Sequence, residues 1–327
     1  MVIINRHSTD PHFNIATEEY VLKNVDEDSF MLWRNSPSII VGKHQNTLAE
    51  INVDYVKRNN LPVVRRLSGG GAVFHDLGNL NFTFVKTGDP ESLIDFRRFT
   101  EPMLDVLRSM EIDAKFEGRN DLTIGGKKFS GNAEHIWKNR VLHHGTLLFS
   151  SHMPDLSAAL NADPLKFSDK AVKSVRSRVT NISNHLKAPM DVQQFAELIL
   201  NHIIFKYPDA RLTELSKDDH SSIDELVRVK YGTWDWNFGY SPNYNFRKLL
   251  RTQKSGTIEI NLDVHNGTIM LIRFFGDYFG KYDSEEIEAS LTGVPHNEAE
   301  VRKALEPFNI DDYFSGLEKD ELISGMF

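Results

Sequence analysis

Apolar residues recur along this chain in two different rhythms, and each rhythm predicts a different kind of element. Asp10 and Pro11 are typical of a helix start, and the apolar residues that follow through Val21 recur at helical spacing. Residues 38–42 form a short apolar run that ends in glycine, which predicts a buried strand. At 80–85 apolar and polar residues alternate one by one, which is typical of a half-buried strand.

The same reasoning predicts the elements of the next part of the chain. We expect a strand at 72–75, a helix between 99 and 110, hairpins that turn at 125–126 and 138–139, a strand at 141–149, and helices at 155–161, 191–206 and 221–230. Strands and helices come in groups rather than in strict βαβ alternation. This favours an α+β fold, with a mixed or antiparallel sheet flanked by helices, over a doubly wound parallel sheet.

A different arrangement begins late in the chain. Apolar residues alternate at 258–262, the chain turns at 266–267, and residues 269–275 return it. Asn-Gly at the turn tolerates the positive φ values of a type I′ hairpin. Two or three short helices are expected to follow, so we place a boundary around 244–252. The predicted division is into two domains, residues 1–246 and a small C-terminal α/β domain at 250–327.

Composition and charge narrow the class of protein. The chain has 327 residues, of which 40% are hydrophobic and 26% charged, an ordinary balance for a folded protein with a sizeable core. The net charge of −8 argues against a protein that coats nucleic acid. The chain contains no cysteine, which excludes disulfides, thiolate metal sites and a cysteine nucleophile. No apolar stretch approaches the ~20 residues that span a membrane, and no signal peptide is evident. We therefore expect a cytoplasmic protein.

Residues 65–76 carry the strongest sign of chemistry. Three successive glycines at 69–71 expose backbone N–H groups and tolerate positive φ, so the loop can approach a phosphate closely. Arg65 and Arg66 precede them and supply permanently charged forks for phosphate or carboxylate. The alternative is a flexible hairpin loop with solvated arginines, which the flanking charged residues disfavour. The segment matches neither the Walker P-loop nor the Rossmann fingerprint.

A second candidate segment spans residues 118–133. If the strand after its glycine turn alternates, Lys128 and Ser130 share one face and Phe129 lies on the other. A lysine among small residues can reach into a pocket. The alternative is that Lys127 and Lys128 are solvated lysines at a turn.

Two further features have less specific interpretations. His143 and His144 are adjacent on a predicted strand and point to opposite faces, so they do not easily bind one metal. A core role is the more common one for such histidines. The charged run at 170–181 is typical of a solvated face, although contact with phosphates or with acidic proteins remains open.

Several of these motifs, in this order, resemble those of the lipoate–protein ligase A family. The matching stretches are residues 14–19, 65–79, 118–121, 128–133, 144–148, 174–181 and 234–239. The part after residue 250 resembles the accessory domain of the family. Any one stretch alone would be a weak signal, whereas the ordered set is specific.

The resemblance implies the fold of the biotin and lipoate ligases and a reaction in two steps. Lipoic acid and ATP, with Mg²⁺ as part of the substrate complex, would give lipoyl-adenylate and pyrophosphate. A lysine of an acceptor lipoyl domain would then attack the adenylate and release AMP. The implied acceptors are the E2 subunits of 2-oxoacid dehydrogenases and the H protein of glycine cleavage. No tightly bound prosthetic group, nucleic acid or membrane is implied.

The resemblance also implies roles for individual residues. Lys128 would be the catalytic residue, clamping both the lipoate carboxylate and the α-phosphate, and Asp121 would bind Mg²⁺. The implied ATP contacts are Arg66, Gly71, Ala72, Val73, Phe74, Asn120, Lys128 and Ala133. The implied lipoate contacts are Trp33, Arg65, Ser68, Gly70, His75 and Lys128.

Three rival functions fit the sequence less well. A lipoyl or octanoyl transferase on the same fold is disfavoured, because such relatives use a cysteine that this chain lacks. A biotin ligase carries a different arginine- and glycine-rich loop. An inactive lipoate-binding paralogue is disfavoured because Lys128, Arg66 and all three loop glycines are present. The sequence leaves open the preferred acceptor, the use of octanoate and the oligomeric state.

Overall fold

The structure is a computed structural model that describes residues 1–88, 94–160, 167–169, 179–252, 256–276, 278 and 280–327. The chain divides into two compact units. Unit 1 consists of Met1–Lys43, Asn60–Leu160 and Ser174–Thr233. Unit 2 consists of His44–Asn59, Asn161–Lys173 and Trp234–Phe327. No helix in the described part of the chain is long and apolar enough to cross a membrane.

Unit 1 is built on a sheet of eight strands among the described residues. In spatial order these are β12 (Arg211–Thr213), β1 (Val2–Ile4), β2 (Ser29–Trp33), β6 (Asn79–Thr87), β10 (Arg140–Leu148), β9 (Lys127–Trp137), β8 (Asp121–Ile124) and β7 (Ala114–Glu117). β1 pairs in parallel with β2 and β12, whereas the other pairs are antiparallel. The mixed sheet of the predicted α+β fold is therefore confirmed.

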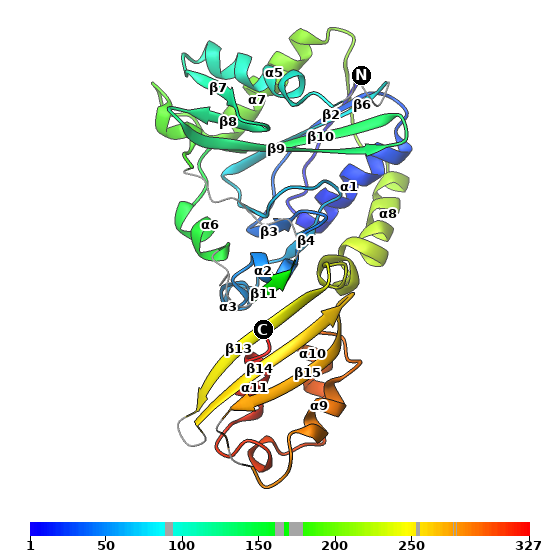
Figure 1. Ribbon diagram of the computed structural model, residues 1–327. Coiled ribbons are helices and arrows are strands. Elements are labelled where there is room, and N and C mark those ends of the chain that lie inside the picture. Colours follow the sequence, from blue (N-terminus) through cyan, green and yellow to red (C-terminus); the bar gives the residue numbers. More distant parts are fainter. Residues whose placement is uncertain (89–93, 161–166, 170–178, 253–255, 277, 279) are drawn as a thin grey trace. The chain divides into compact units, whose positions relative to one another are not determined.

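Helices cover both faces of this sheet (Figure 1). α5 (Phe96–Ser109) and α7 (Val192–Lys206) pack on one face, where Phe82 and Phe84 of β6 meet Phe99 in the main hydrophobic core. α1 (Pro11–Asn24) contacts β6 and β10 from the other face. The helices that complete unit 1 are α6 (Met153–Ala159), η1 (Ile182–His185), α8 (Lys217–Leu226) and the π-helical turn η2 (Val227–Tyr231).

The prediction of a half-buried strand at 80–85 is wrong in one respect, because both faces of β6 are buried. The alternating polar residues Asn81 and Thr83 are as inaccessible as Phe82. They face α1 rather than solvent, and each has a hydrogen-bond partner there or on β2. A buried polar strand face needs such partners, since an unpaired buried polar group is costly. This buried polar face distinguishes the side of the sheet that α1 covers from the apolar side covered by α5 and α7.

A smaller sheet holds the glycine-rich segment. β3 (Ser38–Val41) pairs in parallel with β4 (Val63–Arg65) and antiparallel with β5 (Val73–His75). The glycine loop, defined here as residues 66–72, joins β4 to β5. It lies so close to the end of β3 that a Cβ atom at Gly42 would stand 2.0 Å from the carbonyl oxygen of Gly70.

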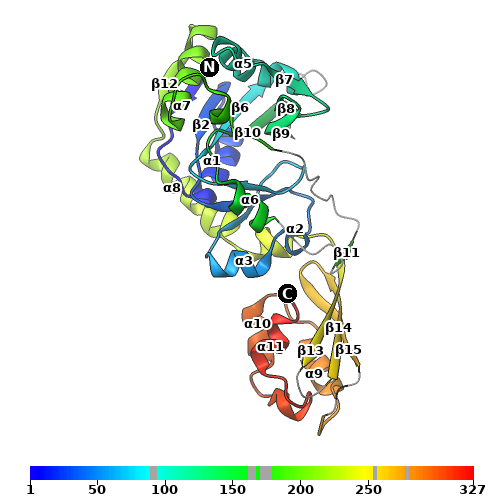
Figure 2. The ribbon, with the colours of Figure 1, turned by 90° about the vertical axis from the view of Figure 1, so that its left-hand side faces the viewer.

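Unit 2 contains a second sheet of four strands among the described residues, in the order β11 (Phe167–Asp169), β13 (Tyr244–Thr252), β14 (Gly256–His265) and β15 (Thr268–Gly276). Figure 2 shows α9 (Glu285–Leu291), α10 (Glu298–Ala304) and α11 (Lys319–Ser324) on one face of it. The remaining elements are α2 (Thr47–Glu50), α3 (Val53–Arg58), η3 (Asp235–Gly239) and η4 (Ile310–Asp312). Asn266 and Gly267 have φ values of 48° and 74°, as the predicted type I′ hairpin requires.

The boundary expected around 244–252 coincides with β13, which pairs with β14 along its length. The stretch of unit 2 that contains β13 begins at Trp234. The functional division into residues 1–246 and 250–327 stays a prediction.

Candidate active site

The glycine loop closes around the buried side chain of Arg66. Nη2 of Arg66 donates to the carbonyl oxygens of Gly69 at 2.6 Å and Gly71 at 2.8 Å. Nη1 donates to the carbonyl oxygen of Ile40 at 3.2 Å. Burial lowers the pKa of Arg66 to about 10, so the group is still a cation at neutral pH. Arg66 therefore braces the loop in this structure, and its predicted contact with ATP stays a prediction.

The other predicted residues of this segment lie on both sides of the brace. The guanidinium of Arg65 is buried, and its Nη1 donates to the carbonyl oxygens of Gly42 at 2.9 Å and Lys43 at 3.0 Å. Gly70 has a φ of 90°, which favours glycine. The remaining predicted contacts run from the loop into β5 and are Gly71, Ala72, Val73 and Phe74.

Six side chains form one continuous set of hydrogen bonds, which we call the Glu18 network. In order, its members are Trp33, Thr83, Glu18, His144, Ser68 and Arg66. Nε1 of Trp33 donates to Oγ1 of Thr83 at 2.9 Å, and this hydroxyl donates to Oε1 of Glu18 at 2.6 Å. Nδ1 of His144 lies 2.9 Å from the same oxygen, and its Nε2 lies 2.6 Å from Oγ of Ser68. Nε of Arg66 donates to that oxygen at 3.0 Å.

His75 lies beside this network with one ring nitrogen unused. Its ring meets that of Trp33 edge to face, with centroids 6.0 Å apart. Nδ2 of Asn35 is 3.1 Å from Nδ1 of His75, whereas Nε2 is buried and has no hydrogen-bond partner among the described residues. Burial, and then the charge of Arg66, lower the pKa of His75 to about 3. The ring is therefore neutral at physiological pH, and its Nε2 is a buried polar atom without a hydrogen-bond partner among the described residues.

Lys128 stands on β9 as a half-buried cation paired with Asp121. Its Nζ lies 2.7 Å from Oδ1 of Asp121 on the neighbouring strand. Gly131 gives the lysine room, because a Cβ atom there would lie 2.9 Å from Nζ. Lys127, by contrast, is exposed. The lysine that the sequence singled out is thus the one held inside the fold.

The strict alternation expected around Lys128 is interrupted. Leu122 of β8 pairs with Ser130, whereas the next residue, Thr123, pairs with Lys128. Phe129 therefore has no partner of its own on β8, although its side chain is fully buried in the core.

Asn120 and Ala133 complete the predicted lysine segment. Nδ2 of Asn120 donates to the carbonyl oxygen of Asn132 at 2.5 Å, and Nδ2 of Asn132 donates to the carbonyl oxygen of Asn120 at 3.0 Å. These reciprocal bonds fix the start of β8 against β9. Ala133 is half-buried on β9 opposite His144 of β10.

Strand pairing brings the two predicted segments into one region of unit 1. The glycine loop reaches β10 through the contact between Ser68 and His144. The lysine segment reaches β10 through the pairing of Ala133 with His144 and through Gly131, whose N–H donates to Oγ1 of Thr146 at 3.1 Å. Of the charged run at 170–181, only residues 179–181 are described, and the N–H of Thr180 donates to the carbonyl oxygen of Lys128 at 2.9 Å. Its other residues lie outside the described part.

The two adjacent histidines of β10 have partners on opposite faces, as the sequence predicted. Oε1 of Glu134 lies 2.9 Å from Nδ1 of His143, whose ring stacks on Phe99. His144 instead belongs to the Glu18 network. The described residues contain no group of three or more His, Cys, Asp or Glu side chains placed to hold a metal ion.

Sequence reasoning assigned no individual role to Glu18 or Thr83, and gave His144 only a core role. Both residues are recognised only in the structure. Glu18 is one of several buried polar residues of α1, together with Asn14 and Thr17, and it is only 3% exposed. Thr83 occupies a polar position of a strand that turned out to be buried on both faces.

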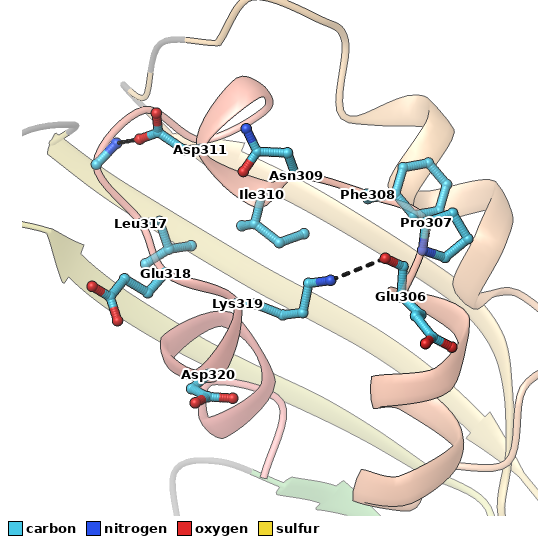
Figure 3. Close-up of a pocket in the computed structure, with 11 residues that line it drawn as sticks. Glu306, Pro307, Phe308, Asn309, Ile310, Asp311, Leu317, Glu318, Lys319 and Asp320 are labelled. Atoms are coloured by element: carbon cyan, nitrogen blue, oxygen red, sulfur yellow. Dashed lines mark hydrogen bonds between the residues drawn. The ribbon is translucent and has the colours of Figure 1, made fainter.

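A separate pocket lies in unit 2 and contains none of the predicted site residues. It has a volume of about 810 Å³ and is lined by residues 306–311 and 316–320 (Figure 3). Four of the eleven lining residues are acidic, and Nζ of Lys319 donates to the carbonyl oxygen of Glu306 at 3.3 Å. We assign it no role in the chemistry.

Two family models match this chain. Residues 10–204 match the lipoyl protein ligase A/B catalytic domain, and residues 241–326 match the bacterial lipoate protein ligase C-terminus. The first match covers the glycine loop, the Glu18 network and Lys128. These features therefore sit in the catalytic domain of an enzyme of the ligase class.

Individual relatives agree with these matches. Lipoate–protein ligase 1 of Staphylococcus aureus is 42% identical over 323 residues, which is 98% of each chain. A lipoate–protein ligase of Bacillus subtilis is 41% identical over 330 residues, covering 99% of this chain and 98% of the relative. A putative lipoate protein ligase of T. acidophilum, solved with bound lipoic acid, has a TM-score of 0.63 at 25% identity, covering 72% of this chain and 98% of that one.

A solved lipoate–protein ligase A bound with ATP has a TM-score of 0.62 at 25% identity, covering 73% of this chain and 98% of that one. The chain belongs to the lipoate–protein ligase family.

Proposed function

We propose that this chain activates lipoate with MgATP and transfers the lipoyl group to a lysine of acceptor lipoyl domains. The observation that carries the proposal is Lys128. It is the cation held half-buried on β9, with Asp121 as its partner and with room provided by Gly131. The strand that carries it pairs with β10, which also contacts the glycine loop through His144.

The first half-reaction joins two anions, the lipoate carboxylate and the α-phosphate of ATP. Fixed cations and N–H donors lower its barrier, because negative charge grows at phosphorus in the transition state. In the proposal Lys128 contacts both reacting groups, and Asp121 turns to Mg²⁺ when MgATP binds. A single carboxylate suffices, since Mg²⁺ commonly takes one or two carboxylates besides phosphate oxygens and water. The loop from Gly71 to Phe74, with Arg66, Asn120 and Ala133, would hold the nucleotide.

Lipoate is proposed to lie against the residues around His75. Trp33 would cover its hydrocarbon chain, and each buried methylene contributes about 0.8 kcal/mol. The unused Nε2 of His75 offers a hydrogen bond, because Asn35 occupies the other ring nitrogen. Arg65, Ser68 and Gly70 complete the proposed lipoate contacts.

The proposed acceptors are the lipoyl domains of E2 subunits and the H protein of glycine cleavage. A bipartite lipoate protein ligase from Thermoplasma acidophilum was studied with its E2 lipoyl domain, and this supports the proposal. Residues 1–246 would carry the chemistry and residues 250–327 would form the accessory domain. Use of ATP fits the cytoplasmic location predicted from the sequence.

The function is tested by incubating the full chain with lipoate, MgATP and a panel of purified lipoyl domains. The expected result is a lipoyl mass increase on the acceptor lysine that requires ATP. Transfer from an acyl-carrier donor without ATP would make the chain a transferase. Binding of lipoate without any transfer to the panel would make it an inactive paralogue.

The role of Lys128 is tested by ATP–pyrophosphate exchange with lipoate. Lys128→Ala should lower the exchange rate by about 10²-fold or more, as the loss of one electrostatic donor does elsewhere. Lys127→Ala is the matched control, because that side chain is exposed, and it should retain exchange. Near-normal exchange by Lys128→Ala would refute the assignment, and an inactive Lys127→Ala would show that the neighbouring lysine acts instead.

A further inference from the structure

The positions of the hydrogens in the Glu18 network follow from its two ends. The indole of Trp33 and the guanidinium of Arg66 can only donate. Thr83 accepts from Trp33 and donates its own hydrogen to Glu18. A carboxylate can only accept, so Nδ1 of His144, 2.9 Å and 3.0 Å from the two oxygens of Glu18, must carry a hydrogen.

The other half of the network fixes the remaining hydrogen. Oγ of Ser68 accepts from Nε of Arg66, and the acceptor within reach of its own hydrogen is Nε2 of His144, at 2.6 Å. In the arrangement in which Ser68 donates this hydrogen, Nε2 of His144 accepts it and the ring carries its own hydrogen on Nδ1. Every hydrogen in the network then points toward Glu18, which is the one group that only accepts.

Arg66 links this network to the direction of the loop amides. Its Nη2 draws the carbonyl oxygens of Gly69 and Gly71 inward. The described chain has no cis peptide bonds, and in a planar trans peptide the C=O and N–H groups point in opposite directions. The N–H group of Gly70 is therefore turned away from Arg66. This is the orientation that a loop needs if its backbone is to meet an anion.

The negative charge of Glu18 also stabilises the cations near it. Glu18 is 3% exposed and Arg66 is 6% exposed, so neither charge is well solvated. Burial lowers the pKa of Arg66 and of Arg6 to about 10, and the negative charge of Glu18 opposes both shifts. A neutral residue at position 18 would leave the buried cation of Arg66 and the partly buried cation of Arg6 without this negative charge.

We propose that Glu18 is a positioning residue for lipoate activation: it fixes the Nδ1–H form of His144, and through Ser68 and Arg66 it sets the orientation of the glycine loop. Glu18 itself reaches the loop only through other side chains. The inference rests on the proposed function for the reaction it serves, but the hydrogen-bond arrangement is independent of that function.

The arrangement is tested by NMR on the full-length protein with ¹⁵N-labelled histidine, without substrates. The measurement is made at about pH 8, above the ordinary pKa range of histidine. His144 should show the Nδ1–H tautomer, and its signal among the 13 histidines is assigned by its loss in His144→Gln. In Glu18→Gln the new amide competes as a donor, so the Nδ1–H form should decrease. An Nε2–H tautomer of His144 in the unaltered protein would overturn the proposal.

The consequence for catalysis is tested by ATP–pyrophosphate exchange with lipoate. Glu18→Gln should lower kcat/KM by on the order of 10²-fold, as small misplacements in a site do. Glu19→Gln is the matched control, because Glu19 lies on the same helix at the same 3% exposure but binds Lys230 and Tyr231 instead. Its rate per folded molecule and its His144 tautomer should be unchanged.

The outcomes separate this proposal from the proposed function. Exchange by Glu18→Gln at the unaltered rate would overturn the positioning role and leave the ligase function standing. Absence of exchange in the unaltered protein would count against the ligase function, while the NMR result would still decide the hydrogen-bond arrangement.

Thr83→Val, which removes one donor to Glu18 but keeps the carboxylate, should retain the Nδ1–H tautomer. Loss of that tautomer in Thr83→Val would show that Glu18 does not fix it.

Discussion

At the residue scale, three buried histidines of unit 1 differ because their partners differ. His75 presents an unused ring nitrogen beside Trp33, His143 lies among aromatic rings with Glu134, and His144 passes a hydrogen bond between Ser68 and Glu18. The sequence could separate the two neighbours on β10 by face, since strand side chains alternate. It could not identify the partners of His144, because α1 and the glycine loop lie far away in the chain.

The pair of Glu134 and His143 gives a prediction about stability and pH. Burial, and then the charge of Asp95, raise the pKa of Glu134 from 4.5 to about 7. Between these values the folded protein keeps a proton that the unfolded chain has lost, so the ionising carboxyl makes folding less favourable as pH rises. Glu134→Gln removes this effect. The stability of the variant relative to the unaltered protein should therefore increase from about pH 4.5 to about pH 7 and then level off.

Chemical denaturation across this pH range measures the difference. The absolute stability is less informative, because burial also holds the pKa of His143 well below 6.5. The free energy of unfolding therefore gains a contribution from His143 as pH rises toward 6.5. The two effects oppose each other in the unaltered protein, whereas the difference between the proteins reports the loss of the Glu134 carboxyl together with its contact to His143. A difference that is independent of pH would mean that Glu134 ionises normally.

At the scale of elements, the fit between β3 and the glycine loop gives a second prediction. In Gly42→Ala the new Cβ would lie 2.0 Å from the carbonyl oxygen of Gly70, far inside van der Waals contact. Either β3 or the loop must move. Unfolding free energy should fall by roughly 1–3 kcal/mol, as for other overpacked sites, and ATP–pyrophosphate exchange should fall with it.

Gly293→Ala is the control for that substitution. Gly293 has a φ of 85°, and a Cβ atom there would meet no described atom within 4 Å, so alanine costs only backbone strain, about 1–2 kcal/mol. It should destabilise without affecting exchange. Equal exchange rates in the two variants would show that the loop tolerates displacement.

The elements that could be predicted from the sequence are those with local signals. Asp10 caps α1 by accepting from the N–H groups of His12 and Phe13, and the Asn-Gly turn joins β14 to β15. The helix expected at 221–230 begins earlier, at Lys217, because Ser216 and Asp219 cap it reciprocally. The buried polar face of β6 was beyond sequence reasoning, since alternation shows which residues share a face but not what covers it.

At the scale of the whole molecule, the two units are interleaved along the chain. Residues 44–59 leave unit 1 after β3 and belong to unit 2, where Leu48 is part of the second hydrophobic core. Lys57 also pairs there with Glu298 of α10. No composition change marks this excursion. A single boundary near residue 246 was therefore the natural interpretation of the sequence, although the contacts of this core are made between segments far apart in the chain.

This interleaving predicts how truncation affects the chain. Removing residues 250–327 takes away β14, β15, α9, α10 and α11, which supply most of the hydrophobic core that includes Leu48, so residues 44–59 lose much of that core. Limited proteolysis followed by mass spectrometry should find new cleavage within 44–59 in the truncated chain and none in the full chain. Because β3 and β4 flank this segment and carry the glycine loop between β4 and β5, the truncated chain should also lose ATP–pyrophosphate exchange. Equal protection of 44–59 in both chains would mean that residues 234–249 suffice to hold this segment, as the bonds of Thr47 to Asn237 and Ser241 allow, and that the catalytic domain ends near residue 246 in structure as well as in sequence.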